Sequence, residues 1–299
     1  MTHQHRVLLD LLARNPHLHA AWYDPHAPEP TIHALAAPGT QNLLLHDTPD
    51  SPHYIIEPQP SRRFHTLLAP LTLAPPRNQN QKCQDEPIEL GTQIQPEHAN
   101  WFGTAGSPCK WRDPDATLHW GILSNWHVMA NGDQRIGRTQ HQPTISQSAV
   151  AKLSRWHEVT PDVEHNIDAA IADALIGDYH TISDRIIGIG TIGPKPLDAT
   201  IGQAVAKSGR TTGVTYGTCT AVGAAVQVDY GDFTATLWDQ DIYSPTDGPF
   251  SGPGDSGSLI VGRSCRCPCS LLFAGNEELT VGNPIRHINS AFNLVYPFP

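Results

Sequence analysis

Basic residues are scarce in this chain of 299 residues, in which 29 aspartates and glutamates outnumber 19 lysines and arginines. The formal net charge at neutral pH is therefore −10. A chain this acidic lacks the diffuse positive field that attracts phosphate backbones. We expect no nucleic acid among its partners.

Long apolar stretches are also absent. No run of residues approaches the ~18 apolar side chains that a membrane-spanning helix needs. The opening residues are interrupted by Asp10 and Arg14, so they lack the unbroken apolar centre and small-residue cleavage site of a secretory signal. We therefore expect a soluble, cytoplasmic protein that makes no membrane contact.

Cysteine is sparse as well, with six residues in the chain, three of them at Cys265, Cys267 and Cys269. Small secreted domains held by disulfides have a much higher cysteine density, so we expect reduced thiols. Zinc is the alternative for this cluster, but zinc sites usually pair a C-x₂₋₄-C unit with a distant second unit, and the spacing here is tighter. We predict no metal and no cofactor.

Charged residues make up only 16% of the chain, whereas it contains 24 glycines and 27 prolines. Glycine and proline together reach about 17% of residues against an ordinary ~12%. This composition indicates many turns and few long charged helices, which favours β structure.

The first 75 residues are predicted to form a small α+β module. Val7, Leu8, Leu11 and Leu12 share one helical face, and Pro16 stops the helix. Short apolar segments of strand length follow at residues 19–23, 31–35, 42–46 and 53–57. An inhibitory segment, a targeting or recognition module, and an adaptor that binds a protein partner through residues 1–75 all remain open as its role.

Residues 76–87 are polar, bounded by prolines and without apolar periodicity, which is typical of a linker. From residue 88 to 299, short strand-like segments alternate with turn residues, as in an all-β barrel or sandwich. These segments are residues 121–124, 169–172, 204–207, 214–218, 225–228, 258–261 and 271–274.

The candidate chemistry centres on Ser256, which lies between Gly254-Asp255 and Gly257. Glycines let the backbone bend so that successive N–H groups point into one cavity, and such a turn presents a nucleophile beside an oxyanion site. A serine hydroxyl needs a base, and the base needs a buried carboxylate that holds its tautomer. His127 at the end of an apolar strand and Asp168 at the start of another supply this pair.

The chain order is histidine, aspartate, serine, which is the order of the chymotrypsin type. From about Ile88 onward the chain resembles the trypsin-like (chymotrypsin-fold) serine peptidases, particularly their bacterial branch. The resemblance lies in Gly-Thr-Ala-Gly at 103–106, Ile-Leu-Ser-Asn-Trp-His at 122–127, Asp-Ala-Ala-Ile-Ala at 168–172 and Gly-Asp-Ser-Gly-Ser at 254–258. Residues 207–213, 271–275 and 282–285 add to it.

The resemblance implies a mainly β protein with two six-stranded Greek-key β-barrels of chymotrypsin type, preceded by the α+β module. It implies a trypsin-like serine endopeptidase that acts on protein or peptide substrates. Ser256 would be the nucleophile, His127 the general base and Asp168 its orienting partner. The backbone N–H groups of Gly254 and Ser256 would form the oxyanion hole.

The resemblance also implies where the substrate pocket lies. Phe250, six residues before the nucleophile, would form its floor, and Phe273, Ala274 and Gly275 would lie on its wall strand. None of these side chains offers a partner for lysine or arginine. We expect cleavage after apolar or small residues.

Asp255, next to the nucleophile, requires a cation, because an uncompensated buried charge costs several kcal/mol. Nothing near Ile88 resembles an Arg-Ile-Val-Gly-Gly activation site that would free an N-terminal ammonium. In the bacterial branch that residues 208–213 resemble, the arginine of this segment serves instead. We therefore predict an Arg210–Asp255 ion pair.

A protein of another class is the alternative: a catalytically silent binding or scaffold protein that keeps the same fold. A protease with an appended PDZ domain is disfavoured, because 43 residues follow Ser256 and these suffice only to complete the second barrel.

Overall fold

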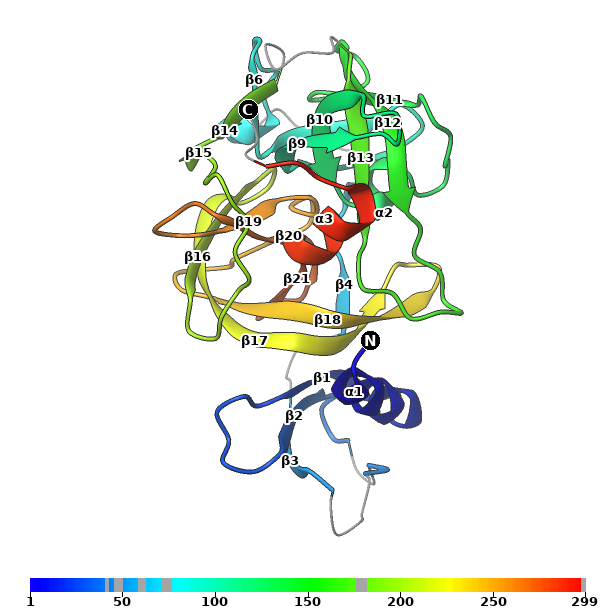
Figure 1. The fold of residues 1–299 in the computed structure, drawn as a ribbon, viewed down its shortest axis with the longest axis vertical. Helices are drawn as coiled ribbons and strands as arrows, with labels where there is room; N and C mark the ends of the chain where they lie inside the picture. Colours follow the sequence, from blue (N-terminus) through cyan, green and yellow to red (C-terminus); the bar gives the residue numbers. More distant parts are fainter. Residues whose placement is uncertain (41–42, 46–50, 59–62, 71–76, 176–181, 297–299) are drawn as a thin grey trace.

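The computed structural model describes residues 1–40, 43–45, 51–58, 63–70, 77–175 and 182–296. The described chain is mainly β, as predicted, with few and short helices (Figure 1). The elements of the first part are α1 (His3–Arg14), β1 (Leu18–Tyr23), β2 (Thr31–Ala36), β3 (His53–Pro58), β4 (Phe64–Thr66), β5 (Ala69–Pro70) and the 3₁₀ helix η1 (Gln79–Gln81).

The remaining elements form the body of the molecule. They are β6 (Ile88–Leu90), β7 (Thr92–Pro96), β8 (Trp101–Ala105), β9 (Ser107–Arg112), β10 (Leu118–Ser124), α2 (Trp126–Met129), β11 (Thr139–His141), β12 (Ala149–His157), β13 (Ala169–Ala174), β14 (Ile182–Ile186), β15 (Gly190–Thr191), β16 (Ala204–Gly209), β17 (Gly213–Asp229), β18 (Thr234–Pro245), β19 (Leu259–Gly262), β20 (Pro268–Gly275), β21 (Thr280–Pro284) and α3 (Ile285–Phe292).

The largest sheet has ten strands in the order β16-β19-β20-β21-β18-β17-β1-β2-β3, with β4 pairing to β17 and β20. Its six strands from β16 to β17 close on themselves, because β16 also pairs with β17. An eight-stranded sheet has the order β5-β8-β7-β11-β12-β13-β10-β9, and a small sheet has the order β15-β14-β6. We expected two six-stranded barrels. One closed ring of six strands is present, and the second barrel stays a prediction.

Strands of the N-terminal module continue the closed ring outward. β1 pairs with β17, with Ala20 opposite Val226 and Ala21 opposite Ala225, and β2 and β3 follow at the edge (Figure 1). Sheet pairing therefore connects the module to the body, and the division of the chain at residues 76–87 stays a prediction.

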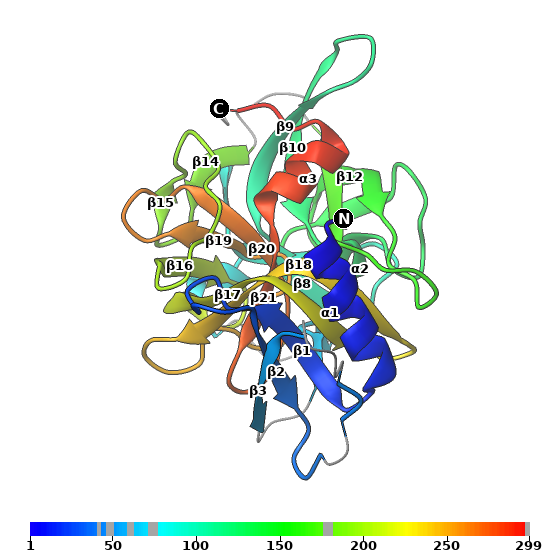
Figure 2. The ribbon, with the colours of Figure 1, turned by 60° about the horizontal axis from the view of Figure 1, so that its bottom comes forward.

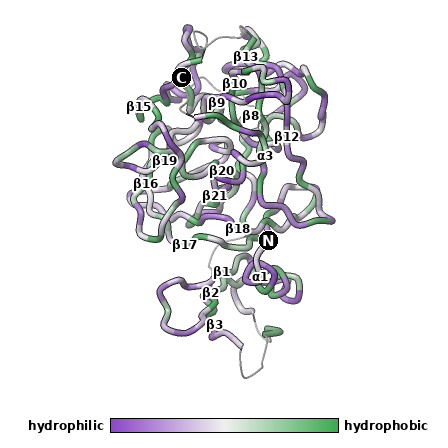
Figure 3. Tube along the Cα trace, in the orientation of Figure 1, coloured by the Kyte–Doolittle hydropathy of each residue, from purple (hydrophilic) through white to green (hydrophobic). Residues whose placement is uncertain are grey.

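Helix α1 covers this extension of the sheet (Figure 2). It begins with a capping box, in which the Thr2 hydroxyl accepts from the His5 N–H at 3.3 Å. Green and purple alternate along it, as an amphipathic helix requires (Figure 3). Its leucines are buried against β1, β2 and β17, and each stabilises the fold by roughly 1.5–3 kcal/mol; they are Leu8, Leu9, Leu11 and Leu12.

Most predicted strands are present, with two differences. Residues 214–218 and 225–228 belong to one long strand, β17, which bends at irregular register near Gly223. The segment 42–46 lies partly outside the described residues, and its described part, 43–45, contains no strand.

The predicted linker is packed in its described part, residues 77–87. Asn80 is buried and donates to the Gly91 carbonyl at 2.7 Å and to the Ser208 hydroxyl at 2.8 Å. A polar sequence here thus bridges two sheets through side-chain hydrogen bonds. Across the described residues, no helix is long and apolar enough to cross a membrane.

Candidate active site

His127 and Asp168 come together because β10 and β13 are neighbours in the eight-stranded sheet. β10 pairs antiparallel with β13, with Ser124 opposite Ala170, so the residues just beyond these strand ends meet. His127 Nδ1 lies 2.5 Å from Asp168 Oδ2, and the His127 backbone N–H donates to Asp168 Oδ1 at 3.2 Å. Both side chains are almost completely buried.

This contact fixes the imidazole tautomer. A carboxylate beside Nδ1 keeps the proton on that nitrogen and leaves Nε2 as the acceptor. His127 Nε2 is buried and has no hydrogen-bond partner among the described residues. The ring is thus prepared to accept a proton at Nε2.

Tyr230 is a further contributor that the sequence analysis missed. Its hydroxyl donates to Asp168 Oδ2 at 2.9 Å, and its ring meets the His127 ring edge-on at 5.9 Å. Burial, and then the charge of Asp168, raises the pKa of Tyr230 well above its usual range, so the hydroxyl stays protonated and donates. Tyr230 lies in the turn between β17 and β18, where no local pattern distinguishes it from an ordinary turn aromatic.

The turn before β19 places Ser256 at the edge of the closed ring. Gly254 has φ 104° and Gly257 has φ 95°, in the left-handed region that favours glycine. A Cβ on Gly257 would lie 2.2 Å from the Thr104 carbonyl oxygen, so the close approach of the two sheets also requires glycine there.

The Ser256 hydroxyl does not bond to His127. It donates to the Phe273 carbonyl at 3.0 Å and accepts from the Leu67 N–H at 3.0 Å. Ser256 Oγ must therefore leave the Phe273 carbonyl before it can give its proton to His127 Nε2.

The two predicted oxyanion donors point at one carbonyl oxygen. The N–H groups of Gly254 and Ser256 donate to the Leu67 oxygen at 2.5 Å and 3.4 Å. The turn therefore holds a peptide carbonyl directly beside the nucleophile, and this carbonyl belongs to the same chain.

Asp255 is neutralised by Lys207, which corrects our prediction that Arg210 would serve. Lys207 Nζ lies 3.0 Å from Asp255 Oδ2, and both side chains are fully buried. Burial lowers the pKa of Lys207, and the Asp255 charge opposes this shift. Lys207 lies on the inward face of β16, whereas Arg210 follows the end of the strand and donates instead to Gln93 Oε1 at 2.7 Å.

The residues predicted to form the substrate pocket are buried, and their role as a pocket stays a prediction. Phe250 is buried in one cluster with Leu67 and Tyr243, and a Cβ on Gly275 would lie 3.3 Å from Leu67 Cδ1. Ala274 of β20 is buried in the larger core cluster, which contains neither Leu67 nor Phe250.

Phe273 behaves differently from our expectation. Its side chain packs in the same larger core cluster as Ala274, whereas Leu272 belongs to the cluster that contains Leu67. The contribution of Phe273 to the site is its carbonyl oxygen, which accepts from Ser256.

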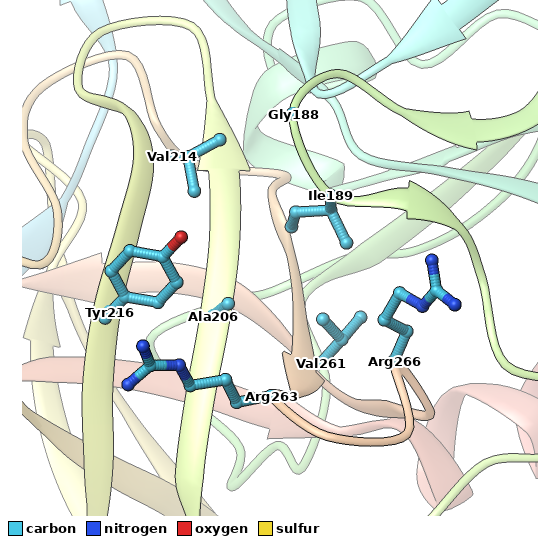
Figure 4. Close-up of a pocket in the computed structure, with 8 residues that line it drawn as sticks. All are labelled: Gly188, Ile189, Ala206, Val214, Tyr216, Val261, Arg263 and Arg266. Atoms are coloured by element: carbon cyan, nitrogen blue, oxygen red, sulfur yellow. The ribbon is translucent and has the colours of Figure 1, made fainter.

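A separate hollow of about 190 Å³ lies between β16, β17, β19 and the turn before β15 (Figure 4). The Arg263 guanidinium stacks on the Tyr216 ring at 4.5 Å. None of the residues predicted for catalysis lines this hollow. Its lining residues are Gly188, Ile189, Ala206, Val214, Tyr216, Val261, Arg263 and Arg266.

The cysteines are free thiols, including Cys265, Cys267 and Cys269. Within the described ranges, no group of three or more histidine, cysteine or acidic side chains is arranged to hold a metal ion.

No protein-family model matches the sequence. Protein NARROW LEAF 1 of Oryza sativa subsp. japonica is 29% identical over 205 residues, which are 59% of this chain and 34% of the rice protein. The chain thus spans about a third of the length of that relative. Because this relative is from a plant, the expected bacterial branch is not supported.

Solved structures resemble this one more extensively. Thermobifida fusca Protease A has a TM-score of 0.52 at 17% identity, over 71% of this chain and 99% of that chain. The Cellulomonas bogoriensis chymotrypsin has a TM-score of 0.51 at 18% identity, over 71% and 99%, and Nocardiopsis protease 0.51 at 19%, over 70% and 98%. The protein therefore has a chymotrypsin-like fold with a small N-terminal helix and strands.

Proposed function

We propose that this protein is a serine endopeptidase that hydrolyses peptide bonds through Ser256, His127 and Asp168. The observation that carries the proposal is the convergence of the Gly254 and Ser256 N–H groups on one peptide carbonyl beside the Ser256 hydroxyl. Two such donors stabilise the negative charge that develops on a carbonyl oxygen during attack.

In the proposed reaction, Ser256 Oγ turns from the Phe273 carbonyl to His127 Nε2 and attacks the substrate carbonyl carbon. His127 takes the hydroxyl proton and then gives it to the leaving amine, and water hydrolyses the acyl-enzyme by the reverse route. Asp168 stabilises the imidazolium, while Tyr230 holds the Asp168 carboxylate in place.

Substrates with an apolar residue before the cleaved bond fit the pocket best. Phe250, Tyr243 and Leu272 belong to the same buried apolar cluster as Leu67, and an arginine or lysine side chain placed among these three side chains would lose its hydration. We expect a peptide-library profile that favours leucine and similar residues, and a strict arginine or lysine preference would contradict this pocket.

A serine-directed fluorophosphonate probe tests the activity. We expect it to label Ser256, whereas Ser256→Ala abolishes labelling and peptide hydrolysis without changing the fold. Because Leu67 fills the pocket, the probe is also applied to Leu67→Asp, whose charge an apolar pocket excludes. Ser146→Ala, at an exposed site in another loop, is the matched control and keeps full labelling.

The absence of labelling in the wild type and in Leu67→Asp would contradict the proposal. That result would favour the alternative, a catalytically silent binding protein. The observation that supports this alternative is the missing hydrogen bond between Ser256 and His127.

A further inference from the structure

Residues 64–70 run past Ser256 as two short strands, β4 and β5, joined by Leu67 and Leu68. On one side β4 pairs antiparallel with β20, with Thr66 opposite Ala274 and His65 opposite Gly275. On the other side β5 pairs antiparallel with β8, with Ala69 opposite Phe102. Figure 1 shows β4 passing from the N-terminal strands into the body of the molecule. The segment therefore crosses from one large sheet to the other beside Ser256.

Leu67 is held at this crossing by three hydrogen bonds of its backbone and by the packing of its side chain. Its carbonyl oxygen accepts from the Gly254 and Ser256 N–H groups, and its own N–H donates to Ser256 Oγ. Its side chain is 3% exposed and packs in the cluster that contains Phe250. Strand pairing on both sides fixes the direction of the chain through the Leu67–Leu68 bond.

We propose that the Leu67–Leu68 peptide bond is a substrate of this same molecule, and that the protein cleaves itself there. The inference rests on the proposed function, since it uses the same nucleophile and base. It assigns the bond that is cut and the residues on either side of it.

The step balances with water as the co-reactant. Ser256 Oγ bonds to the Leu67 carbonyl carbon and gives its proton to His127 Nε2. The Leu67 C–N bond then breaks, and that proton passes to the Leu68 nitrogen. Water hydrolyses the ester, which leaves a carboxylate on Leu67, an ammonium on Leu68 and the free Ser256 hydroxyl.

Two features favour a bound substrate over a segment that merely fills space. The Leu67 carbonyl accepts from both N–H groups of the glycine turn, which is how a turn of this kind would hold the carbonyl of a bound substrate. His127 Nε2, moreover, is buried without a partner among the described residues, and this orphaned acceptor is satisfied once Ser256 Oγ turns toward it.

The upstream piece should remain bound after the cut. β1 pairs with β17, and the leucines of α1 are buried in a cluster that includes Ala225 of the body. Cleavage would thus convert one chain into two pieces, residues 1–67 and 68–299, that stay together without a covalent link.

The test is the intact mass of the purified full chain under denaturing conditions. We expect the wild type to give the two pieces with a new N-terminus at Leu68, and Ser256→Ala to stay whole. The same two pieces should elute together from a size-exclusion column without denaturant. Leu67→Asp should block the cut, whereas the same substitution at the exposed Leu44 should leave it unchanged.

Mixing and dilution show whether the reaction is intramolecular. Ser256→Ala chains mixed with wild type should stay whole, and the cleavage rate should not change over a hundredfold dilution. Cleavage of the Ser256→Ala chains by wild type, or a rate proportional to concentration, would overturn cleavage within one molecule.

A wild type that stays whole, or is cut elsewhere, also overturns the proposal. If Leu67→Asp then reacts with the fluorophosphonate probe, the proposed function stands and residues 64–70 only block the site. If neither protein reacts, both proposals fail.

Discussion

The buried Lys207–Asp255 pair beneath the Ser256 turn offers a quantitative test of how this site is built. In Lys207→Met the ammonium is replaced by an apolar group of similar length, and Asp255 keeps only neutral donors. These include the Thr211 N–H at 2.8 Å and the Thr212 hydroxyl at 2.7 Å. The carboxylate would remain fully buried without its counter-charge.

Removing one partner of a buried ion pair costs about 3–5 kcal/mol. At about 2–4 °C per kcal/mol for a protein of this size class, the melting temperature should fall by about 6–20 °C. Lys207→Met combined with Asp255→Asn removes both charges and should recover most of the loss. The coupling energy between the two sites is then expected to be about 3 kcal/mol.

The assay is denaturant unfolding of four proteins: the parent chain, Lys207→Met, Asp255→Asn and the double variant. Each also carries Ser256→Ala so that no chain is cut. Arg210→Met is the matched control, because its guanidinium bonds to the neutral groups of Gln93 and Thr211 and should cost only about 1–2 kcal/mol. Equal losses for Lys207→Met and Arg210→Met would refute the assignment of Lys207 as the counter-ion.

Three further changes test the rest of the site and the core. Asp168→Asn should lower kcat by about 10⁴, because an amide favours the wrong His127 tautomer; peptide hydrolysis measures this, and a loss below tenfold would count against the role of Asp168. Tyr230→Phe removes a hydrogen bond to a buried carboxylate, and such a bond is worth about 1.5–3 kcal/mol. The substitution should lower kcat/KM at least tenfold. A kcat/KM within twofold of wild type would mean that the Tyr230 hydroxyl has no role in positioning Asp168. Burial raises the pKa of Asp241 to about 7, so the folded chain retains a proton that the unfolded chain loses near pH 4. The free energy of unfolding should therefore fall by about 4 kcal/mol between pH 4 and pH 7. At pH 8 the unfolding midpoint of Asp241→Asn should be higher than that of the wild type, whereas at pH 4 it should not be. A difference independent of pH would contradict this linkage.

Local patterns carried much of the sequence analysis. The leucine spacing and Pro16 predicted α1, and the apolar strands that precede His127 and follow Asp168 predicted where those side chains lie. Glycines around Ser256 predicted a sharp turn with converging N–H groups. Each of these inferences depends only on neighbours along the chain, which is why the sequence could supply them.

Contacts between distant segments were not predictable in this way. Leu67 meets Ser256 across 189 residues and Tyr230 meets Asp168 across 62, and no periodicity relates them. The choice between Lys207 and Arg210 depends on which of them reaches Asp255: Lys207 lies within β16, whereas Arg210 follows its end and bonds to Gln93. The counter-charge itself was foreseeable, since a buried carboxylate requires one.

Because β4 is covalently attached to the body, it competes with any free peptide for the same binding position. A tethered segment acts at an effective concentration on the order of 1 mM. A free peptide of equal intrinsic affinity, supplied at about 1 µM, would therefore occupy the edge of β20 in only about one molecule in a thousand. Sheet pairing through β1 keeps the segment nearby even if the chain is cut after Leu67. Low turnover in a peptide screen at micromolar concentration would therefore reflect competition from the tethered segment, whatever the reactivity of Ser256.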